Sequence, residues 1–261
     1  MDIDLAETGR GGNPNRGIRI IHHEEVTGVS VSAWAYGWRV FRRRDSSAWD
    51  IDERIHPLLK QHLAAKAPRI ITSESLPALR KALTVPAETL PKNERVIVHN
   101  EFLPSGLRVR VYTPKAEKAE YPALLWIHGG GHIMGSPEGN EALLLRIAEE
   151  IGCIVAAPAY RQTPENPYPA DLDDCYSALV WMTENLPVRK DRVAVAGQSA
   201  GGGLTAALAL RARDSGGPVL CFQMPLYPML DCRNITPSTY QICDHRACAE
   251  ISTCLRGKCT L

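Results

Sequence analysis

The feature that most constrains the fold is an alternation of apolar and amphipathic segments between residues 121 and 230. Three apolar segments, ALLWI, IVAAPAY and RVAVAGQS, each precede a stretch with helical spacing. The segment VLCFQMPLYPML adds a further strand candidate. Apolar strands that alternate with amphipathic helices are typical of a mostly parallel sheet covered by helices on both faces. The sequence therefore predicts an α/β fold, and this pattern alone predicts no function.

Helices and strands can be predicted from local signals on either side of this alternation. RVIVHNEFL and LRVRVYTP, separated by Pro104-Ser105-Gly106, predict two strands joined by a turn. Helices are predicted around Glu141–Ile151, with Gly152 ending the first, and around Asp171–Leu186. Before them, IDERIHPLLKQHL over 51–63 and SESLPALRKAL predict two more helices. In the second of these we expect Ser75 to cap the helix and an apolar side made of Leu76, Leu79 and Leu83.

Composition excludes several classes of protein. The chain has 261 residues, enough for one large domain, and its formal charge of +1 gives no reason to expect a nucleic acid partner. No stretch approaches the roughly 20 apolar residues of a membrane span, and the N-terminus does not resemble a signal peptide. We therefore expect a cytoplasmic protein.

The eight cysteines predict neither a metal site nor a disulfide framework. Cys153, Cys175 and Cys221 lie in apolar segments and are predicted to be core residues. The other five fall within residues 232–261 without a C-x-x-C pair. We expect no metal and no cofactor.

Two glycine motifs carry the chemical prediction. Gly197-Gln198-Ser199-Ala200-Gly201 joins a predicted strand to a predicted helix, the setting in which a G-x-S-x-G turn exposes a nucleophilic serine. His128-Gly129-Gly130-Gly131 follows the strand ALLWI, and such glycines let several backbone N–H groups point at one oxyanion. Either motif alone is also compatible with a tight strand-to-helix turn. Their combination and order favour acyl transfer.

With these motifs the chain resembles the hormone-sensitive-lipase-like branch of the α/β-hydrolases, a family of carboxylesterases and lipases. The segments YRQTPENPYPADLDD at 160–174 and YPMLDCRNITPS at 227–238 extend the resemblance, which covers about Ile51 to Ser238. The chain departs from the family at Gln198, where aspartate is more common, and at His132, where a large aromatic is more common. Cys232 also replaces a usual aspartate.

The resemblance implies roles for particular residues. Ser199 would be the nucleophile, and the N–H groups of Gly130, Gly131 and Ala200 would form the oxyanion hole. His128 and Gly129 would support the glycine loop, and Glu165 and Asp174 would belong to the scaffold. The implied organisation is an unassigned extension over 1–48, a helical cap segment over 49–90, an α/β-hydrolase core over 91–238 and an atypical cysteine-rich tail over 239–261.

The base that should activate Ser199 is not evident. In this fold the acid and histidine follow the serine on later loops, and one strand, one helix and their connections take about 20–25 residues. Only 31 residues, 231–261, remain for two such steps, so the sheet is expected to lack its last strands. The candidate bases are His245, which stands next to Asp244, and His132.

Two functions therefore stay open. The first is a serine carboxylic-ester hydrolase that forms an acyl-enzyme on Ser199, acts on small esters and is impaired if no base is present. The second is an inactive hydrolase-fold fragment that binds an acyl group or ester, or that binds a partner. In either case an exposed sheet edge is expected, and such an edge favours a homo-oligomer or another protein partner.

Overall fold

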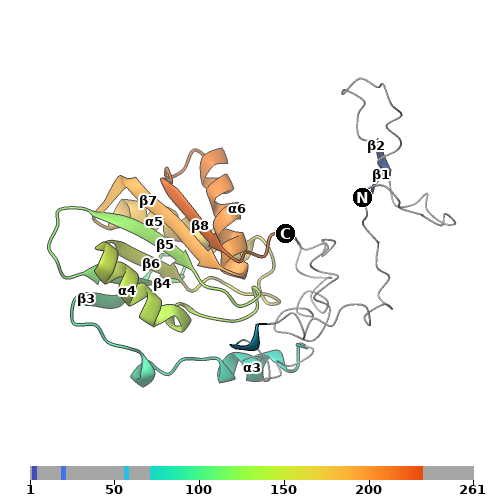
Figure 1. Ribbon diagram of the computed structural model, residues 1–261, viewed down its shortest axis with the longest axis horizontal. Helices are drawn as coiled ribbons and strands as arrows, with labels where there is room; N and C mark the ends of the chain where they lie inside the picture. Colours follow the sequence, from blue (N-terminus) through green and yellow to red (C-terminus); the bar gives the residue numbers. More distant parts are fainter. Residues whose placement is uncertain (1, 5–18, 22–55, 59–70, 232–261) are drawn as a thin grey trace. The chain divides into compact units, whose positions relative to one another are not determined.

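The computed structural model of the chain describes residues 2–4, 19–21, 56–58 and 71–231 (Figure 1). The chain divides into two compact units, Met1–Asp50 and Ile51–Leu261. In the first unit β1 (Asp2–Asp4) pairs antiparallel with β2 (Arg19–Ile21). The helix predicted over 51–63 lies outside the described residues except at 56–58, and the cysteine-rich tail lies outside them entirely.

The second unit contains a six-stranded sheet in the order β3-β4-β6-β5-β7-β8. Its strands are β3 (Val96–Phe102), β4 (Arg108–Pro114), β5 (Tyr121–Ile127), β6 (Ile154–Pro158), β7 (Val188–Gln198) and β8 (Phe222–Leu226). β3 pairs antiparallel with β4, and β4 with β6, whereas the β6–β5, β5–β7 and β7–β8 pairs are parallel. This sheet confirms the predicted α/β fold with a mostly parallel sheet.

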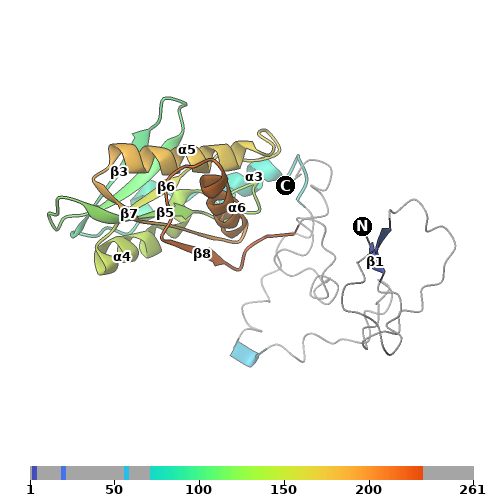
Figure 2. The ribbon, with the colours of Figure 1, turned by 90° about the horizontal axis from the view of Figure 1, so that it is seen from above.

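Helices cover both faces of the sheet (Figure 2). The helical elements are α3 (Leu76–Ala82), η3 (Ala87–Thr89), η4 (Pro137–Asn140), α4 (Glu141–Ile151), α5 (Ala170–Asn185) and α6 (Ala200–Asp214). Successive β5 side chains enter different cores: Leu125 joins the cluster that contains α5 and α6 residues, and Trp126 joins the one that contains α4 residues. This division follows from the two-residue period of a strand, which buries a strand on both faces when both are covered.

Two details of α3 correct the sequence prediction. Ser75 does not cap the helix with its side chain; its Oγ accepts a hydrogen bond from the Thr72 N–H at 2.9 Å instead. Leu76 is buried as expected, but Leu83 follows the last helical residue and is 51% exposed. The helix is shorter than its apolar spacing indicated, so only its first part contributes to the core.

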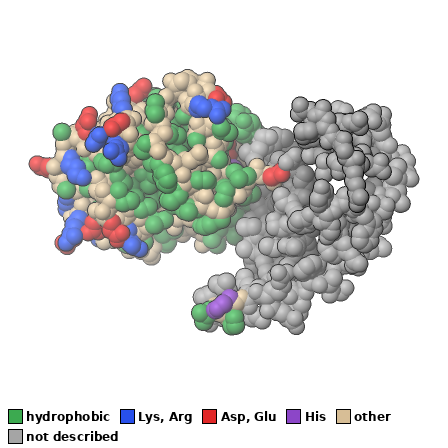
Figure 3. All heavy atoms as spheres, turned by 45° about the horizontal axis from the view of Figure 1, so that its top comes forward, with side chains coloured by type: hydrophobic (Ala, Val, Ile, Leu, Met, Phe, Trp, Pro, Cys, Tyr) green, Lys and Arg blue, Asp and Glu red, His purple; other side chains and the backbone are tan. Residues whose placement is uncertain are grey.

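The β8 edge differs from the rest of the sheet. Cys153 and Cys175 are buried as predicted, but Cys221, just before β8, is exposed, so the core prediction was wrong there. Several large apolar side chains from β8 onward are also exposed: Phe222, Tyr227 and Leu230. A broad area of hydrophobic side chains is visible in Figure 3, with charged side chains mainly at its margin. No helix among the described residues is long and apolar enough to cross a membrane.

Candidate active site

Ser199 lies on the sharp turn between β7 and α6. Its backbone has φ 55° and ψ −118°, a conformation that costs an ordinary residue about 1–3 kcal/mol and that occurs mostly at functional sites. The flanking glycines allow the turn to pack closely. A Cβ on Gly201 would overlap the Ile127 carbonyl at the end of β5, and one on Gly197 would overlap the Gly201 carbonyl. Any other residue at either position would force the turn away from β5.

The structure brings the glycine loop into contact with this turn. A Cβ placed on Gly129 would lie 2.9 Å from the Gln198 carbonyl oxygen and 3.4 Å from the Ser199 Cβ. β5 and β7 are parallel neighbours, so their carboxyl ends meet at the same edge of the sheet. The loop that follows β5 and the serine that follows β7 are therefore adjacent, although 70 residues separate Gly129 from Ser199.

The orientation of the Gly130 N–H is set by His128. The Nδ1 of His128 lies 2.7 Å from the Gly129 carbonyl oxygen, which can only accept, so Nδ1 carries the proton. That carbonyl belongs to the same planar peptide unit as the Gly130 N–H, which points in the opposite direction. The imidazole thus holds one of the proposed oxyanion donors in place.

The peptide unit between Gly130 and Gly131 is held by backbone hydrogen bonds. The Gly130 carbonyl oxygen accepts hydrogen bonds from the N–H groups of Ile133 and Met134, both at 3.1 Å. The Gly131 N–H, on the opposite side of that peptide unit, is oriented by these two bonds. Within residues 71–231 neither the Gly130 nor the Gly131 N–H donates a hydrogen bond.

The third donor, the Ala200 N–H, belongs to the first turn of α6. The Ser199 carbonyl oxygen of the same peptide unit accepts from the N–H groups of Gly203 and Met229, both at 3.0 Å. The Ser199 N–H donates to the Leu226 carbonyl oxygen at 2.9 Å. The end of β8 and the residues after it therefore hold the serine turn, and the N-terminus of α6 favours negative charge there.

His128 lies beneath the loop and stays neutral near pH 7. Burial lowers its pKa to about 4, although the bond to Gly129 acts in the opposite direction. Its ring stacks on Tyr160 with centroids 4.2 Å apart, and the Tyr160 hydroxyl donates to the His128 carbonyl at 3.0 Å. Nε2 is buried and has no partner among the described residues. This arrangement suits a support for the loop and does not suit a base for Ser199.

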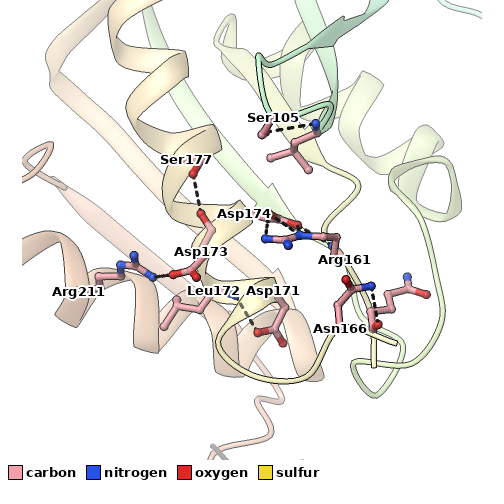
Figure 4. Close-up of polar contacts among 11 residues, drawn as sticks. Ser105, Arg161, Asn166, Asp171, Leu172, Asp173, Asp174, Ser177 and Arg211 are labelled. Atoms are coloured by element: carbon pink, nitrogen blue, oxygen red, sulfur yellow. Dashed lines mark hydrogen bonds and ion pairs between the residues drawn. The ribbon is translucent and has the colours of Figure 1, made fainter. Parts of the chain in front are cut away.

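His132 is bound to Asp171. Its Nδ1 lies 2.7 Å from the Asp171 Oδ2, both side chains are buried, and the Asp171 Oδ1 accepts from the Leu172 N–H at 2.8 Å. Figure 4 shows Asp171 and Leu172 together at the start of α5. No side chain within residues 71–231 forms a hydrogen bond with the Ser199 hydroxyl, and His245 lies outside the described residues.

The other acidic residues at the start of α5 pair with arginines. Asp174 binds the Arg161 guanidinium and also accepts from the Arg161 N–H at 2.8 Å (Figure 4). Asp173 pairs with Arg211 of α6. These contacts tie α5 to its neighbours, and no group of His, Cys, Asp or Glu suited to a metal ion occurs among the described residues.

Arg80, for which the sequence motifs indicate no role, reaches the glycine loop from α3. Its Nε donates to the Ile133 carbonyl oxygen at 2.6 Å, and its guanidinium forms an ion pair with Glu165 at 2.8 Å. The sequence contains one indication that Arg80 faces the core. It lies four residues after Leu76, which places both side chains on the same side of a helix.

Comparison with known proteins identifies the family. Residues 124–255 match the family model described as alpha/beta hydrolase fold, which covers half of the chain. The chain therefore belongs to the α/β-hydrolase family, in its hormone-sensitive-lipase-like branch. The match continues past Ser238, the point at which the resemblance was expected to end.

Relatives and solved structures agree with this assignment. The chain is 35% identical to Esterase LipI and 36% identical to Carboxylesterase NlhH, both of Mycobacterium tuberculosis, each over 67% of this chain. It spans 57% of the length of each. The structures of a Bacterial Heroin Esterase and of esterase LipW from Mycobacterium marinum are both 30% identical, with TM-scores of 0.68. The match to the heroin esterase covers 79% of this chain and 68% of the esterase. The match to LipW covers 81% of this chain and 71% of LipW.

Proposed function

We propose that this protein hydrolyses carboxylic esters through an acyl-enzyme on Ser199. The Ser199 Oγ attacks the ester carbonyl carbon, the alcohol leaves with a proton, and water then releases the acid. The observation that carries the proposal is the contact between the glycine loop and the serine turn. Each of the three N–H groups belongs to a peptide unit whose carbonyl oxygen is fixed by a hydrogen bond to another group. The esterase names of the relatives support esters as substrates.

A working hydrolase also needs a base for the Ser199 proton. His245 and His132 remain the candidates, and the bond from His132 to Asp171 engages its Nδ1 while leaving Nε2 for a proton. Loss of a triad histidine typically lowers turnover by about 10⁶, whereas oxyanion donors and binding alone retain roughly 10³–10⁴ over water. Without a base, we expect slow turnover.

A second function, an inactive ester-binding or protein-binding module, is favoured by a different observation. Among residues 71–231 no base is hydrogen bonded to Ser199, and β8 pairs only with β7. An open strand edge with exposed apolar side chains is suited to pairing with another chain.

Hydrolysis of p-nitrophenyl acetate and butyrate separates the two functions. Wild type is compared with Ser199→Ala, His245→Ala and His132→Phe, the last because an aromatic side chain is common at this position in the family. Esterase activity that Ser199→Ala removes, together with rapid fluorophosphonate labelling of Ser199, supports the hydrolase. Equal background rates in all four proteins would exclude it, and the histidine variant that loses activity identifies the base.

A further inference from the structure

Arg80 connects α3 to two loops of the core. Its Nε donates to the Ile133 carbonyl oxygen at 2.6 Å and its Nη2 donates to the Thr163 carbonyl oxygen at 2.8 Å. Both terminal nitrogens also bind the Glu165 carboxylate, at 2.8 and 2.9 Å. One planar guanidinium therefore satisfies acceptors from two segments that are about 30 residues apart in the chain.

The Ile133 contact leads directly to a proposed oxyanion donor. The Ile133 carbonyl and the Met134 N–H belong to one peptide unit, and this N–H donates to the Gly130 carbonyl oxygen at 3.1 Å. The Gly130 carbonyl in turn shares a peptide unit with the Gly131 N–H. Because peptide units are planar and rigid, these two units connect the Arg80 guanidinium to the Gly131 N–H.

The Thr163 contact holds the same turn from its other side. The Thr163 N–H donates to the His132 carbonyl oxygen at 3.0 Å, while its own carbonyl accepts from Arg80. The turn over 130–134 thus depends on Arg80 at Ile133 and, through Thr163, at His132. His132 has a positive φ of 63°, an unfavourable conformation for a non-glycine residue that these contacts help to maintain.

We propose that Arg80 is a positioning residue that couples the placement of α3 to the orientation of the Gly131 N–H, and hence to the oxyanion hole. The proposal rests on the proposed function. Glu165 is 58% exposed, so its ion pair contributes little to stability and serves to orient the guanidinium. A lysine has no planar fork and cannot bind all these acceptors at once, so Arg80→Lys should not restore the arrangement.

Amide hydrogen exchange in the full chain tests the coupling without requiring turnover. Arg80→Met is compared with Arg146→Met, a matched change to an exposed arginine of α4 whose partner within residues 71–231 is Glu150. In Arg80→Met we expect amide exchange within 129–134 to accelerate by about tenfold or more, because the turn over 130–134 can then open without the rest of the domain unfolding. Exchange in β3 and β4 should be unchanged. Arg146→Met should leave 129–134 as in wild type. Unchanged exchange at 129–134 in Arg80→Met would overturn the proposal, whether or not the protein hydrolyses esters.

Ester hydrolysis provides the second readout where turnover is measurable. Loss of one oxyanion donor typically lowers kcat by about 10²–10³, so Arg80→Met should reduce kcat within that range while KM changes by less than about threefold. Arg80→Lys should recover less than about a tenth of the lost activity. A KM increase with kcat unchanged would show that Arg80 acts on ester binding and not on the oxyanion hole, which overturns the proposal.

Glu165→Gln keeps the experiment decisive if Arg80→Met fails to fold. This variant leaves the Ile133 and Thr163 contacts possible but weakens the orientation of the guanidinium. We expect exchange within 129–134 to accelerate by about threefold, less than for a variant without the guanidinium. Exchange identical to that of wild type would show that the guanidinium orientation does not control the turn, contrary to the proposal.

Discussion

The serine turn with its glycine loop and the β8 edge lie next to each other but differ in how completely they are packed. Around Ser199 the supporting residues are almost fully buried, with Ile127 and Ala200 at 0% exposure and His128 at 2%. Along and after β8, Phe222 is 59% and Tyr227 71% exposed. Ser199, the proposed nucleophile, and the three proposed oxyanion donors therefore all lie within residues 71–231. Within the same residues no side chain is hydrogen bonded to the Ser199 hydroxyl, and of the two candidate bases only His132 lies there.

This difference separates two requirements of acyl transfer. Holding a hydroxyl beside oriented N–H groups needs strands β5 and β7, the loops after them, and the end of β8, where the Leu226 carbonyl accepts from the Ser199 N–H. Removing the proton needs a side chain brought from elsewhere in the fold. The serine turn and the glycine loop can therefore be formed without a base beside them, and the following changes test how far these two features depend on the rest of the chain.

The largest expected effect is that of Ser199→Ala. Without its nucleophile the protein should lose on the order of 10⁶ in kcat if a base is present, and far less if the rate is already close to background. Initial rates with p-nitrophenyl butyrate measure the change, with Ser215→Ala at the other end of α6 as the control. A substantial rate that survives Ser199→Ala would show that hydrolysis occurs at another site.

The second effect is that of a methyl group at Gly201. Because the Cβ would overlap the carbonyls of both Ile127 and His128, Gly201→Ala should lower the free energy of unfolding by about 3 kcal/mol or more. Gly139→Ala is the matched control, since a Cβ there meets nothing within 4 Å. Urea denaturation compares the two, and equal stabilities would mean that the turn does not pack against β5 as described.

The third effect is a loss of stability in mild acid. The pKa of His128 is about 4 in the folded protein because of burial, against about 6.5 when unfolded, so the unfolded chain takes up the proton first. The contribution of His128 to stability is intact above pH 6.5 and is lost as the pH falls towards 4, by up to about 3 kcal/mol. In His128→Asn, whose amide can still donate to the Gly129 carbonyl, urea denaturation at pH 7, 5.5 and 4.5 should show a smaller decrease. Parallel decreases in both proteins would contradict this assignment.

The smallest expected effect on stability is at the β8 edge. Phe222→Gln should change the free energy of unfolding by less than about 0.5 kcal/mol, because the side chain is already 59% exposed. It should nevertheless reduce self-association, measured by sedimentation over a range of concentrations, since an exposed aromatic side chain on an open edge favours contacts between chains. A large loss of stability would show that this edge is covered in the folded protein.

Several features of this protein follow from local sequence alone. The helices around Glu141–Ile151 and Asp171–Leu186, the strands of the sheet and the end of α4 at Gly152 were predicted closely, and Gly152 has the left-handed φ of 67° expected of a helix end. The glycine motifs also identified which loops meet. These features depend on neighbouring residues, through hydrophobic spacing and the allowed backbone angles.

Only the tertiary structure decided which side chains find partners. Ser75 binds Thr72 instead of capping α3, Cys221 is exposed at an edge strand, and Arg80 and Asp171 reach the segment after the glycine loop from distant helices. No local sequence pattern specifies these hydrogen-bond partners or the exposure of Cys221. Each depends on surfaces that approach one another only when the sheet order β3-β4-β6-β5-β7-β8 has formed. The sequence by itself therefore determined the fold class and the two glycine motifs on which the proposed chemistry rests, and the packing of remote segments determined how those motifs are held.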